Sequence, residues 1–149
     1  MLSKKTKYAL KALRFLASKY GEGPVLISEI AETEHISQKF LESILLELRK
    51  GRVLSSKKGK GGGYYLIKDP NEVTLCDIHR MIEGPIAPLP CVSLNYYEPC
   101  DDCDDEVSCT LKKVMCDVRD AQLDILKQKS LIDLIPEGVE APKSDLIDE

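Results

Sequence analysis

The sequence predicts a mainly α-helical fold with a small β-hairpin, extended at its end by a long helix. Apolar residues recur at helical spacing through most of the chain, and a glycine-rich basic segment at 57–63 lies between two short β-like runs. A loop with four cysteines then precedes the last long helical segment. With 149 residues, 43% of them hydrophobic, the chain can bury one compact core, which excludes a large multidomain enzyme.

Three helices are predicted in the first fifty residues. The first runs from Ser3 to Tyr20, after which Gly21 can adopt the left-handed conformation that stops a helix. The second covers 27–34, and a short turn leads to Ser37, a good N-cap for a third helix from 38 to 50. This third helix carries one apolar stripe, formed by Phe40, Leu41, Ile44, Leu45 and Leu48.

The second and third helices have the form of a helix-turn-helix. Two short helices joined by a tight turn, the second with polar side chains near its N-terminus, fit a DNA major groove about 12 Å wide. The third helix is therefore predicted to read base edges with the side chains that face away from its apolar stripe. These predicted DNA contacts are Ser37, Gln38, Lys39, Glu42, Ser43 and Arg49.

The glycine-rich segment has the form of a wing, which is a hairpin with a basic tip. Runs 53–56 and 64–67 are expected to pair as strands, and the glycines between them let the backbone approach DNA closely. A nucleotide-binding loop is an alternative, but such a loop leads into a helix N-terminus, whereas this one leads into a β-like run. A plain flexible turn is the simplest alternative. The predicted DNA contacts here are Lys57, Lys58, Lys60, Gly61 and Gly62.

The net charge of −4 conceals two halves of opposite sign. Residues 1–68 hold 14 Lys and Arg against 6 Asp and Glu, a net of +8, whereas residues 69–149 hold 7 against 19, a net of −12. A basic half suits a polyanion, because neutralising phosphates releases condensed counterions. A solvated charged face would explain the charge alone, but its coincidence with a helix-turn-helix and a wing favours double-stranded DNA as the partner.

A cysteine-rich loop follows a short helix, which begins at a capping box of Thr74 and Asp77 and ends at the Glu-Gly-Pro run 83–85. Its four thiols favour a metal or a cluster, with zinc and iron–sulfur both candidates, although free redox-active thiols are the alternative. The spacing lacks the two Cys-x2-Cys pairs of a zinc ribbon and leaves the metal open. The loop is acidic, with six Asp and Glu and no Lys or Arg between its first and last cysteine. The loop thiols are Cys91, Cys100, Cys103 and Cys109.

The other cysteines and the two histidines are expected to be structural. Cys116 lies seven residues beyond Cys109, about 10 Å along a helix, which is too far for both thiols to ligate one metal ion. Cys116 and Cys76 are therefore predicted to be packing residues. Neither His35 nor His79 lies near the four loop cysteines in sequence, so an enzyme built on these cysteines is poorly supported.

The last long helix, predicted from 107 to 129, carries a heptad seam. Such a seam indicates a dimer, whose twofold axis would present two reading helices to a palindromic operator. The alternative is a stripe packed on the first helices of the same chain. A short helix is expected to follow up to 135. The seam comprises Val107, Leu111, Val114, Val118, Ala121 and Ile125.

The expected organisation has four parts: a winged helix-turn-helix domain at 1–83, a sensor loop at 84–106, the dimerisation segment at 107–135 and a frayed acidic tail at 136–149. No apolar run approaches the ~18 residues of a membrane span, and the N-terminus lacks the cleavage region of a signal peptide. We therefore expect a cytoplasmic protein with no membrane partner, in which the thiols are reduced.

The run from Leu48 to Pro85 resembles a known family. Its Leu-Arg pair, the Lys-Gly and Gly-Gly-Tyr of the wing, and the final Glu-Gly-Pro are similar to the winged-helix regulators typified by IscR, NsrR and CymR, the Rrf-two family. The resemblance spans roughly residues 1–135 and implies a homodimeric bacterial transcription factor, more commonly a repressor. Lys58 stands where arginine is common in that family, and lysine lacks the fork for bidentate contacts.

The resemblance also implies an iron–sulfur cluster, [2Fe–2S] or [4Fe–4S], that responds to redox stress, nitric oxide or iron–sulfur status. The ligands it implies are Cys91, Cys103 and Cys109, while Cys100 is an extra thiol that could replace Cys103 or act as a fourth ligand. Lys112 occupies the position of a histidine found in some members. The alternative is a cluster-free regulator controlled by thiol oxidation or by a protein partner.

Overall fold

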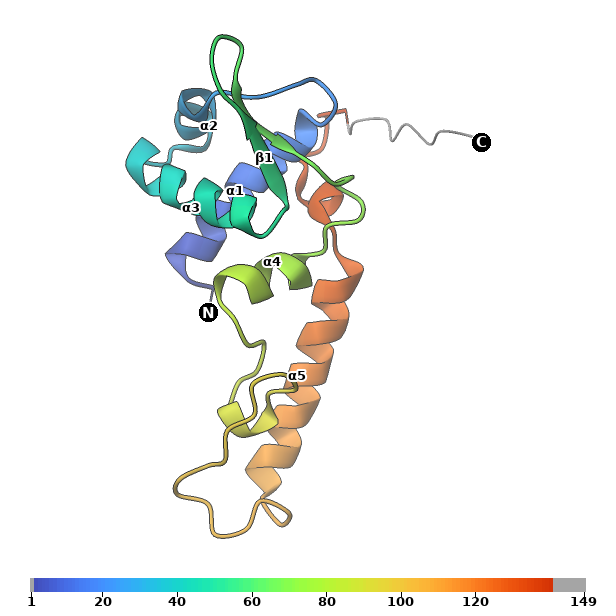
Figure 1. The fold of residues 1–149 in the computed structure, drawn as a ribbon. Helices are drawn as coiled ribbons and strands as arrows, with labels where there is room; N and C mark the ends of the chain where they lie inside the picture. Colours follow the sequence, from blue (N-terminus) through green and yellow to red (C-terminus); the bar gives the residue numbers. More distant parts are fainter. Residues whose placement is uncertain (1, 141–149) are drawn as a thin grey trace.

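The computed structural model describes residues 2–140 and confirms the predicted mainly α-helical fold with a small wing (Figure 1). The last nine residues of the predicted acidic tail, 141–149, lie outside the described residues. No helix in the described part of the chain is long and apolar enough to cross a membrane. The elements are α1 Lys4–Ser18, α2 Ile27–Glu34, α3 Gln38–Lys50, β1 Leu54–Lys57, β2 Gly63–Leu66, α4 Leu75–Ile82, η1 Pro90–Val92, α5 Thr110–Gln128 and η2 Leu131–Leu134.

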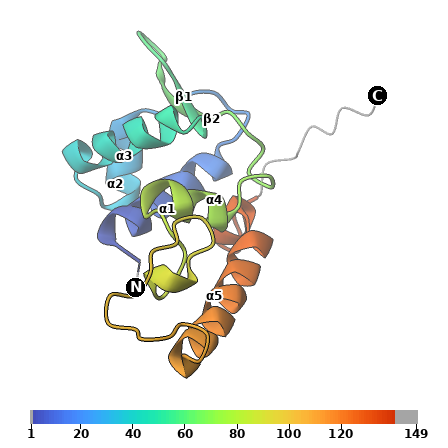
Figure 2. The same ribbon diagram turned by 60° about the horizontal axis from the view of Figure 1, so that its bottom comes forward.

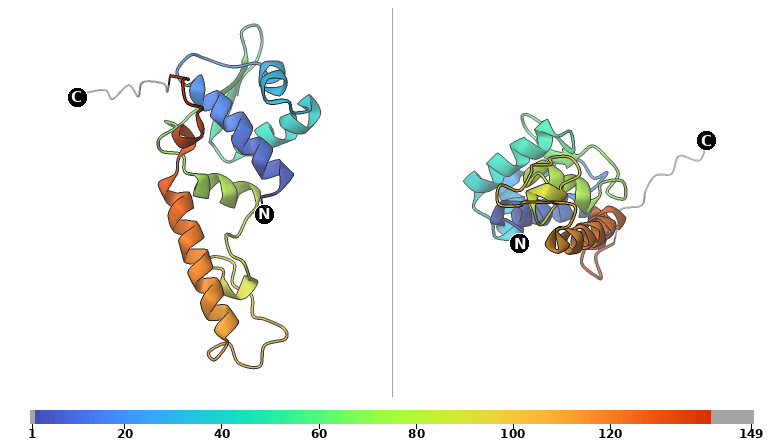
Figure 3. Two further views of the ribbon diagram at one scale, coloured as in Figure 1. Left: turned by 180° about the vertical axis from the view of Figure 1, so that it is seen from behind. Right: turned by 90° about the horizontal axis from the view of Figure 1, so that it is seen from below.

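The elements form a head and a stalk. Helices α1 to α4 and the hairpin make the head, and α5 extends away from it (Figures 1 and 3). The loop between α4 and α5 runs down beside the stalk, so the cysteine-rich segment and the wing lie at opposite ends of the molecule (Figure 1). Helix α5 begins at the far end of the stalk and carries the chain back to the head, where η2 packs on α1 (Figure 1).

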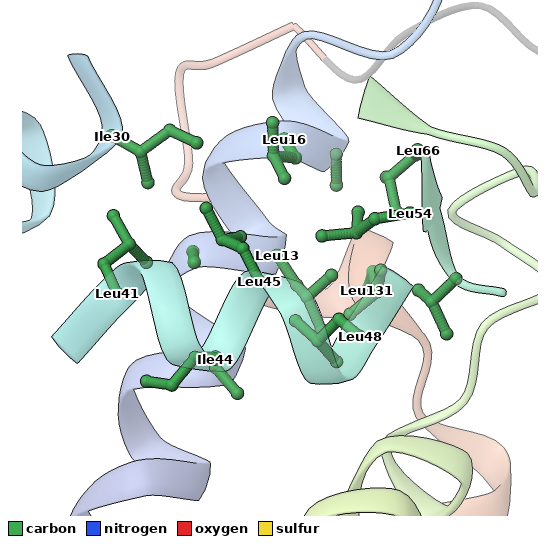
Figure 4. Packing of buried hydrophobic residues seen from close by; sticks show 14 of the residues in the cluster. Leu13, Leu16, Ile30, Leu41, Ile44, Leu45, Leu48, Leu54, Leu66 and Leu131 are labelled. Carbon is green, nitrogen blue, oxygen red and sulfur yellow. The ribbon is translucent and has the colours of Figure 1, made fainter. Parts of the chain in front are cut away.

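The core of the head lies where α3 crosses α1. Both helices bury one face completely, and the strands, α2 and η2 close the sides of the cluster (Figure 4). The predicted apolar stripe of α3 is confirmed for its four aliphatic members, while the fifth, Phe40, is half-buried against the core. The large side chains that are at most 4% exposed include Leu13, Leu16, Ile30, Leu41, Ile44, Leu45, Leu48, Leu54, Leu66 and Leu131.

The hairpin is antiparallel and lies one residue nearer the tip than predicted. Leu54 pairs with Leu66, and Lys57 pairs with Gly63. Glycine is needed at the start of β2, because Gly63 has φ +146° and a Cβ there would lie 2.2 Å from the carbonyl oxygen of Val25. This close approach lets the segment before α2 bridge to the wing strand.

Two helix ends differ from the prediction by two or more residues. Helix α1 ends at Ser18 rather than Tyr20, and α5 begins at Thr110 rather than Val107. The late start of α5 has a local cause: the Asp105 carboxylate accepts hydrogen bonds from the backbone N–H groups of 107 and 108, which holds these residues in a turn. Cys109 then becomes the N-cap, since its sulfur accepts a hydrogen bond from the Lys112 N–H.

Candidate DNA-binding surface and cysteine loop

Helix α3 presents its predicted reading residues on the face opposite the core. Ser37 caps the helix by accepting the Phe40 N–H at 3.3 Å, and all six predicted residues are exposed. The Ser43 hydroxyl donates to the Phe40 carbonyl at 2.7 Å, so its oxygen still has room for an incoming donor. Sequence reasoning missed Leu46, which is 43% exposed on the same face and offers an apolar contact.

The wing brings its predicted residues together at the tip of the hairpin. This tip projects from the head beside α2 and α3 (Figure 2). Lys57, Lys58, Lys60 and Gly61 are exposed, and no ion pair engages these three lysines among the described residues. Gly62 differs from them, because it is buried and donates its N–H to the carbonyl of residue 59. Within residues 2–140, three lysines without an ion pair therefore lie together at one projecting tip.

The four loop cysteines line one cavity of about 200 Å³. Cys91 is buried, Cys103 and Cys109 are half-buried, and Cys100 is exposed. The other two cysteines do not line this cavity; Cys76 is buried in a second small apolar cluster with Ile86 and Leu123, as predicted. The remaining lining residues are Leu89, Asp102, Glu106, Leu111 and Lys112.

The chemistry of this cavity suits a cluster held by thiolates. Within residues 2–140, no three Cys, His, Asp or Glu side chains are grouped as one metal ion would require. An iron–sulfur cluster contains several irons, so its thiolates do not have to meet at one point. A cavity lined by four thiols, with Leu89 and Leu111 as apolar walls, therefore fits such a group.

Two of the loop thiols have a pKa above the ordinary value for cysteine. Partial removal from solvent raises the pKa of the Cys103 thiol, with Cys109 adding to the rise. Cys100 donates a hydrogen bond to Asp102 at 3.0 Å, which raises the pKa of that thiol. Binding of a metal centre would therefore release protons from these thiols.

Two basic residues of α5 hold the loop against the stalk. Lys112 pairs with Glu106 at 2.6 Å, and the Tyr97 hydroxyl donates to the other oxygen of that carboxylate, also at 2.6 Å. Further along, Arg119 donates to the carbonyl of Val92, next to Cys91, at 2.6 Å. The Glu106 bond with Lys112 lowers the pKa of the carboxyl and raises that of the amine. Sequence spacing gave no signal for this tether, because its partners are joined only by the fold of the loop.

The heptad seam of α5 is exposed in the single chain. Leu111, Val114, Val118 and Ile125 are between 45% and 61% exposed, and Val107 lies in the turn before the helix. The face that α5 turns to its own chain instead carries Leu123, which is 4% exposed. The stripe is therefore not packed on the first helices of the same chain.

Comparison with known proteins identifies relatives along nearly the whole chain. The Rrf2 family profile, described as iron-dependent transcriptional regulator, matches residues 2–137. A protein of Rhodobacter capsulatus, named as an rrf2-like HTH-type transcriptional regulator, is 44% identical over 146 residues, which cover 96% of this chain and 97% of that protein. CymR of Bacillus subtilis is 40% identical over 88 residues, which cover 59% of this chain and 64% of that protein.

Solved structures agree with these relatives. The structure of B. subtilis CymR, described as the global cysteine regulator, has a TM-score of 0.76 at 34% identity and covers 90% of this chain and 95% of that one. IscR of T. potens has a TM-score of 0.70 at 29% identity and covers 90% of this chain and 85% of that one. The family profile and the R. capsulatus and B. subtilis relatives are described as transcriptional regulators rather than as enzymes.

Proposed function

This chain belongs to the Rrf2 family of transcriptional regulators, and we propose that it is a homodimeric repressor whose cysteine loop controls its affinity for a palindromic operator. The observation that carries the DNA-binding part is the exposed polar face of α3 beside a projecting tip, whose three lysines form no ion pair in the described part of the chain. A helix of this kind reads base edges in the major groove, while basic side chains on a wing neutralise phosphates.

The proposed contacts divide into two groups with different effects. On α3, the side chains of Gln38, Lys39, Glu42 and Ser43 lie near the N-terminus, where they can reach bases, while Ser37 and Arg49 mark the two ends of the exposed face. On the wing, the three lysines contact phosphates or the minor groove, and Gly61 keeps the backbone close to DNA. Gly62, which is buried, supports the tip rather than contacting DNA directly.

The proposed dimer rests on the seam of α5. Four large aliphatic side chains at heptad spacing are about half exposed in the single chain, and a second copy of α5 would bury them. Burying apolar surface contributes about 25 cal/mol for each Å² removed from water. A twofold pair would also present two α3 helices to the half-sites of a palindrome.

The proposed cofactor site consists of Cys91, Cys103 and Cys109, with Cys100 as the candidate fourth ligand. A [2Fe–2S] or [4Fe–4S] cluster, when bound there, would supply a redox-active and oxidant-sensitive centre. The protein's own part is to hold the loop: Arg119 fixes the segment of Cys91 on α5, and Lys112 with Glu106 folds back the segment between Cys100 and Cys109. Because both anchors lie on α5, a change in the loop would act on the dimer helix.

A cluster-free regulator is the second candidate. The likeness to B. subtilis CymR, described as a cysteine regulator, favours it, as does the solvent access of Cys100. In this case, oxidation of the loop thiols or binding of a protein partner would change the same anchors on α5.

Anaerobic purification followed by iron and sulfide analysis separates the two candidates. The cluster proposal expects a coloured protein with thiolate-to-iron absorption, and DNA affinity that changes when the cluster is removed. Cys91→Ala should abolish both the absorption and this change. Cys116→Ala is the matched control, because Cys116 does not line the cavity and should leave both unaltered. A colourless protein whose DNA binding responds to peroxide would favour the cluster-free regulator instead.

A further inference from the structure

Glu34 is the one charged residue that is buried in the described part of the chain. It is the last residue of α2 and immediately precedes the turn of the helix-turn-helix. Its side chain is only 7% exposed. Burying a carboxylate costs several kcal/mol unless partners compensate it, so its position at this turn needs an explanation.

Two cations from successive turns of α1 hold Glu34. Arg14 places Nη2 2.7 Å from Oε2 and Nε 3.2 Å from Oε1, so that its fork matches both carboxylate oxygens. Lys11 donates to the backbone carbonyl of Glu34 at 2.5 Å and lies 3.9 Å from the carboxylate. The Glu34 carboxylate also raises the pKa of Arg14, chiefly through its hydrogen bond with the guanidinium group. The end of α2 is thus fixed to α1 through both its side chain and its backbone.

The same contacts reach the start of α3. His35 follows Glu34 in the left-handed conformation, with φ 55° and ψ 49°, and Ser37 is already the N-cap of α3. On the other side of the turn, the ring of Tyr8 meets Phe40 of α3 edge to face, with 5.7 Å between centroids. The Lys11 amine lies 5.7 Å from the centre of the Tyr8 ring. Helix α1 therefore contacts the residue before the turn through Lys11 and the start of α3 through Tyr8.

We call the contacts of Arg14 and Lys11 with Glu34 the clamp, and stability alone does not explain it. Replacing a buried ion pair with apolar residues of similar volume is often neutral or stabilising, so such a pair is weak evidence for stability. Direct contact with DNA is also a poor explanation, because the fork of Arg14 is occupied by Glu34 and the carboxylate is buried. What the clamp does fix is the direction in which the chain leaves α2 and enters α3.

We propose that Arg14 and Lys11, by gripping Glu34, are positioning residues that set the orientation of α3 for sequence-specific DNA reading. This proposal rests on the proposed function, in which α3 enters the major groove. A bidentate base contact needs its side chain in one geometry, whereas phosphate contacts tolerate small rotations of the helix. Loss of the clamp should therefore reduce discrimination between sequences more than it reduces overall affinity.

The test uses the full chain and two DNA probes: a duplex selected by the wild-type protein from a random library, and a scrambled duplex of the same composition. The variant carries Arg14→Met and Glu34→Leu together, because removing one partner alone would leave an unpaired buried charge. We expect the ratio of specific to non-specific affinity to fall at least tenfold. The affinity for the scrambled duplex and its salt dependence should stay within about twofold of the wild type, a pattern that a merely structural pair would not produce.

Lys5→Gln with Glu47→Gln is the matched control. This half-exposed ion pair also joins α1 to α3, but it lies away from the turn, so its loss should leave the affinity ratio within about twofold. If the double apolar variant does not fold, Arg14→Lys decides in its place, because lysine keeps the charge but cannot make both bonds. We then expect the ratio to fall at least threefold.

Two results would overturn the proposal in distinguishable ways. If the wild-type protein discriminates and the folded clamp variant discriminates equally well, the clamp does not position α3. If the wild-type protein itself prefers no duplex over a scrambled one, the proposed function fails, and the clamp proposal fails with it.

Discussion

Removing the wing lysines should change the salt dependence of DNA binding by a predictable amount. Lys58 and Lys60 are exposed, and neither forms an ion pair within the described chain, so both charges are available to phosphates. Each neutralised phosphate contributes about 0.9 to the slope of log affinity against log salt. Replacing both lysines with alanine should therefore flatten this slope by about 1.8 units. Between 50 and 200 mM salt, the variant should lose roughly tenfold less affinity than the wild type.

The assay is fluorescence anisotropy on a labelled duplex at four or more salt concentrations. Lys113→Ala with Lys127→Ala is the charge-matched control, because both residues are exposed on α5, away from the wing. This control should leave the slope unchanged. The reasoning is refuted if the two double variants flatten the slope equally, since the effect would then reflect net charge, or if the wing variant leaves the slope intact.

Three further predictions concern base reading, pH and assembly. Gln38→Ala should shrink the penalty for one mismatched base pair by about 1–3 kcal/mol in competition binding, with the salt slope unchanged; a uniform loss across all sequences would contradict its base-reading role. Glu83→Gln should remove part of the acid sensitivity of urea unfolding, because hydrogen bonds from Ser3 and Thr6 lower the pKa of this carboxyl from 4.5 to about 2. A depressed pKa gives stability that is present above pH 4.5 and lost as the pH falls towards 2. Identical pH profiles of unfolding for Glu83→Gln and the wild type would exclude this contribution of Glu83. Val114→Glu should shift the protein to monomers in sedimentation, and an unchanged dimer would rule out the α5 seam.

The helices could be predicted from sequence because their signals are local. The apolar stripe of α3 and the capping box of α4 depend on spacings of three and four residues, and both are confirmed. The start of α5 was wrong by three residues, because the side chain of Asp105 competes for the backbone N–H groups that would have begun the helix. The strands lie one residue nearer the tip than predicted, and β2 begins at Gly63, whose backbone approaches Val25, a residue distant in sequence.

The candidate sites were predictable in composition but not in geometry. Glycine and lysine content identified the wing, yet the inward turn of Gly62 became visible only in the folded hairpin. Cysteine spacing identified the sensor loop, but its anchors on α5, Lys112 and Arg119, are joined to it only by tertiary structure. The clamp on Glu34 brings together residues twenty positions apart, for which a single sequence carries no pattern.

Hydroxyl-radical footprinting of the anaerobically purified protein on its selected duplex, with the stoichiometry measured by sedimentation, tests the central claim most directly. Two chains should bind each duplex and protect two half-sites whose centres are separated by one helical turn, about 10 base pairs, or by a multiple of it. A single chain bound to each duplex, or a duplex left unprotected at any protein concentration, would contradict the account.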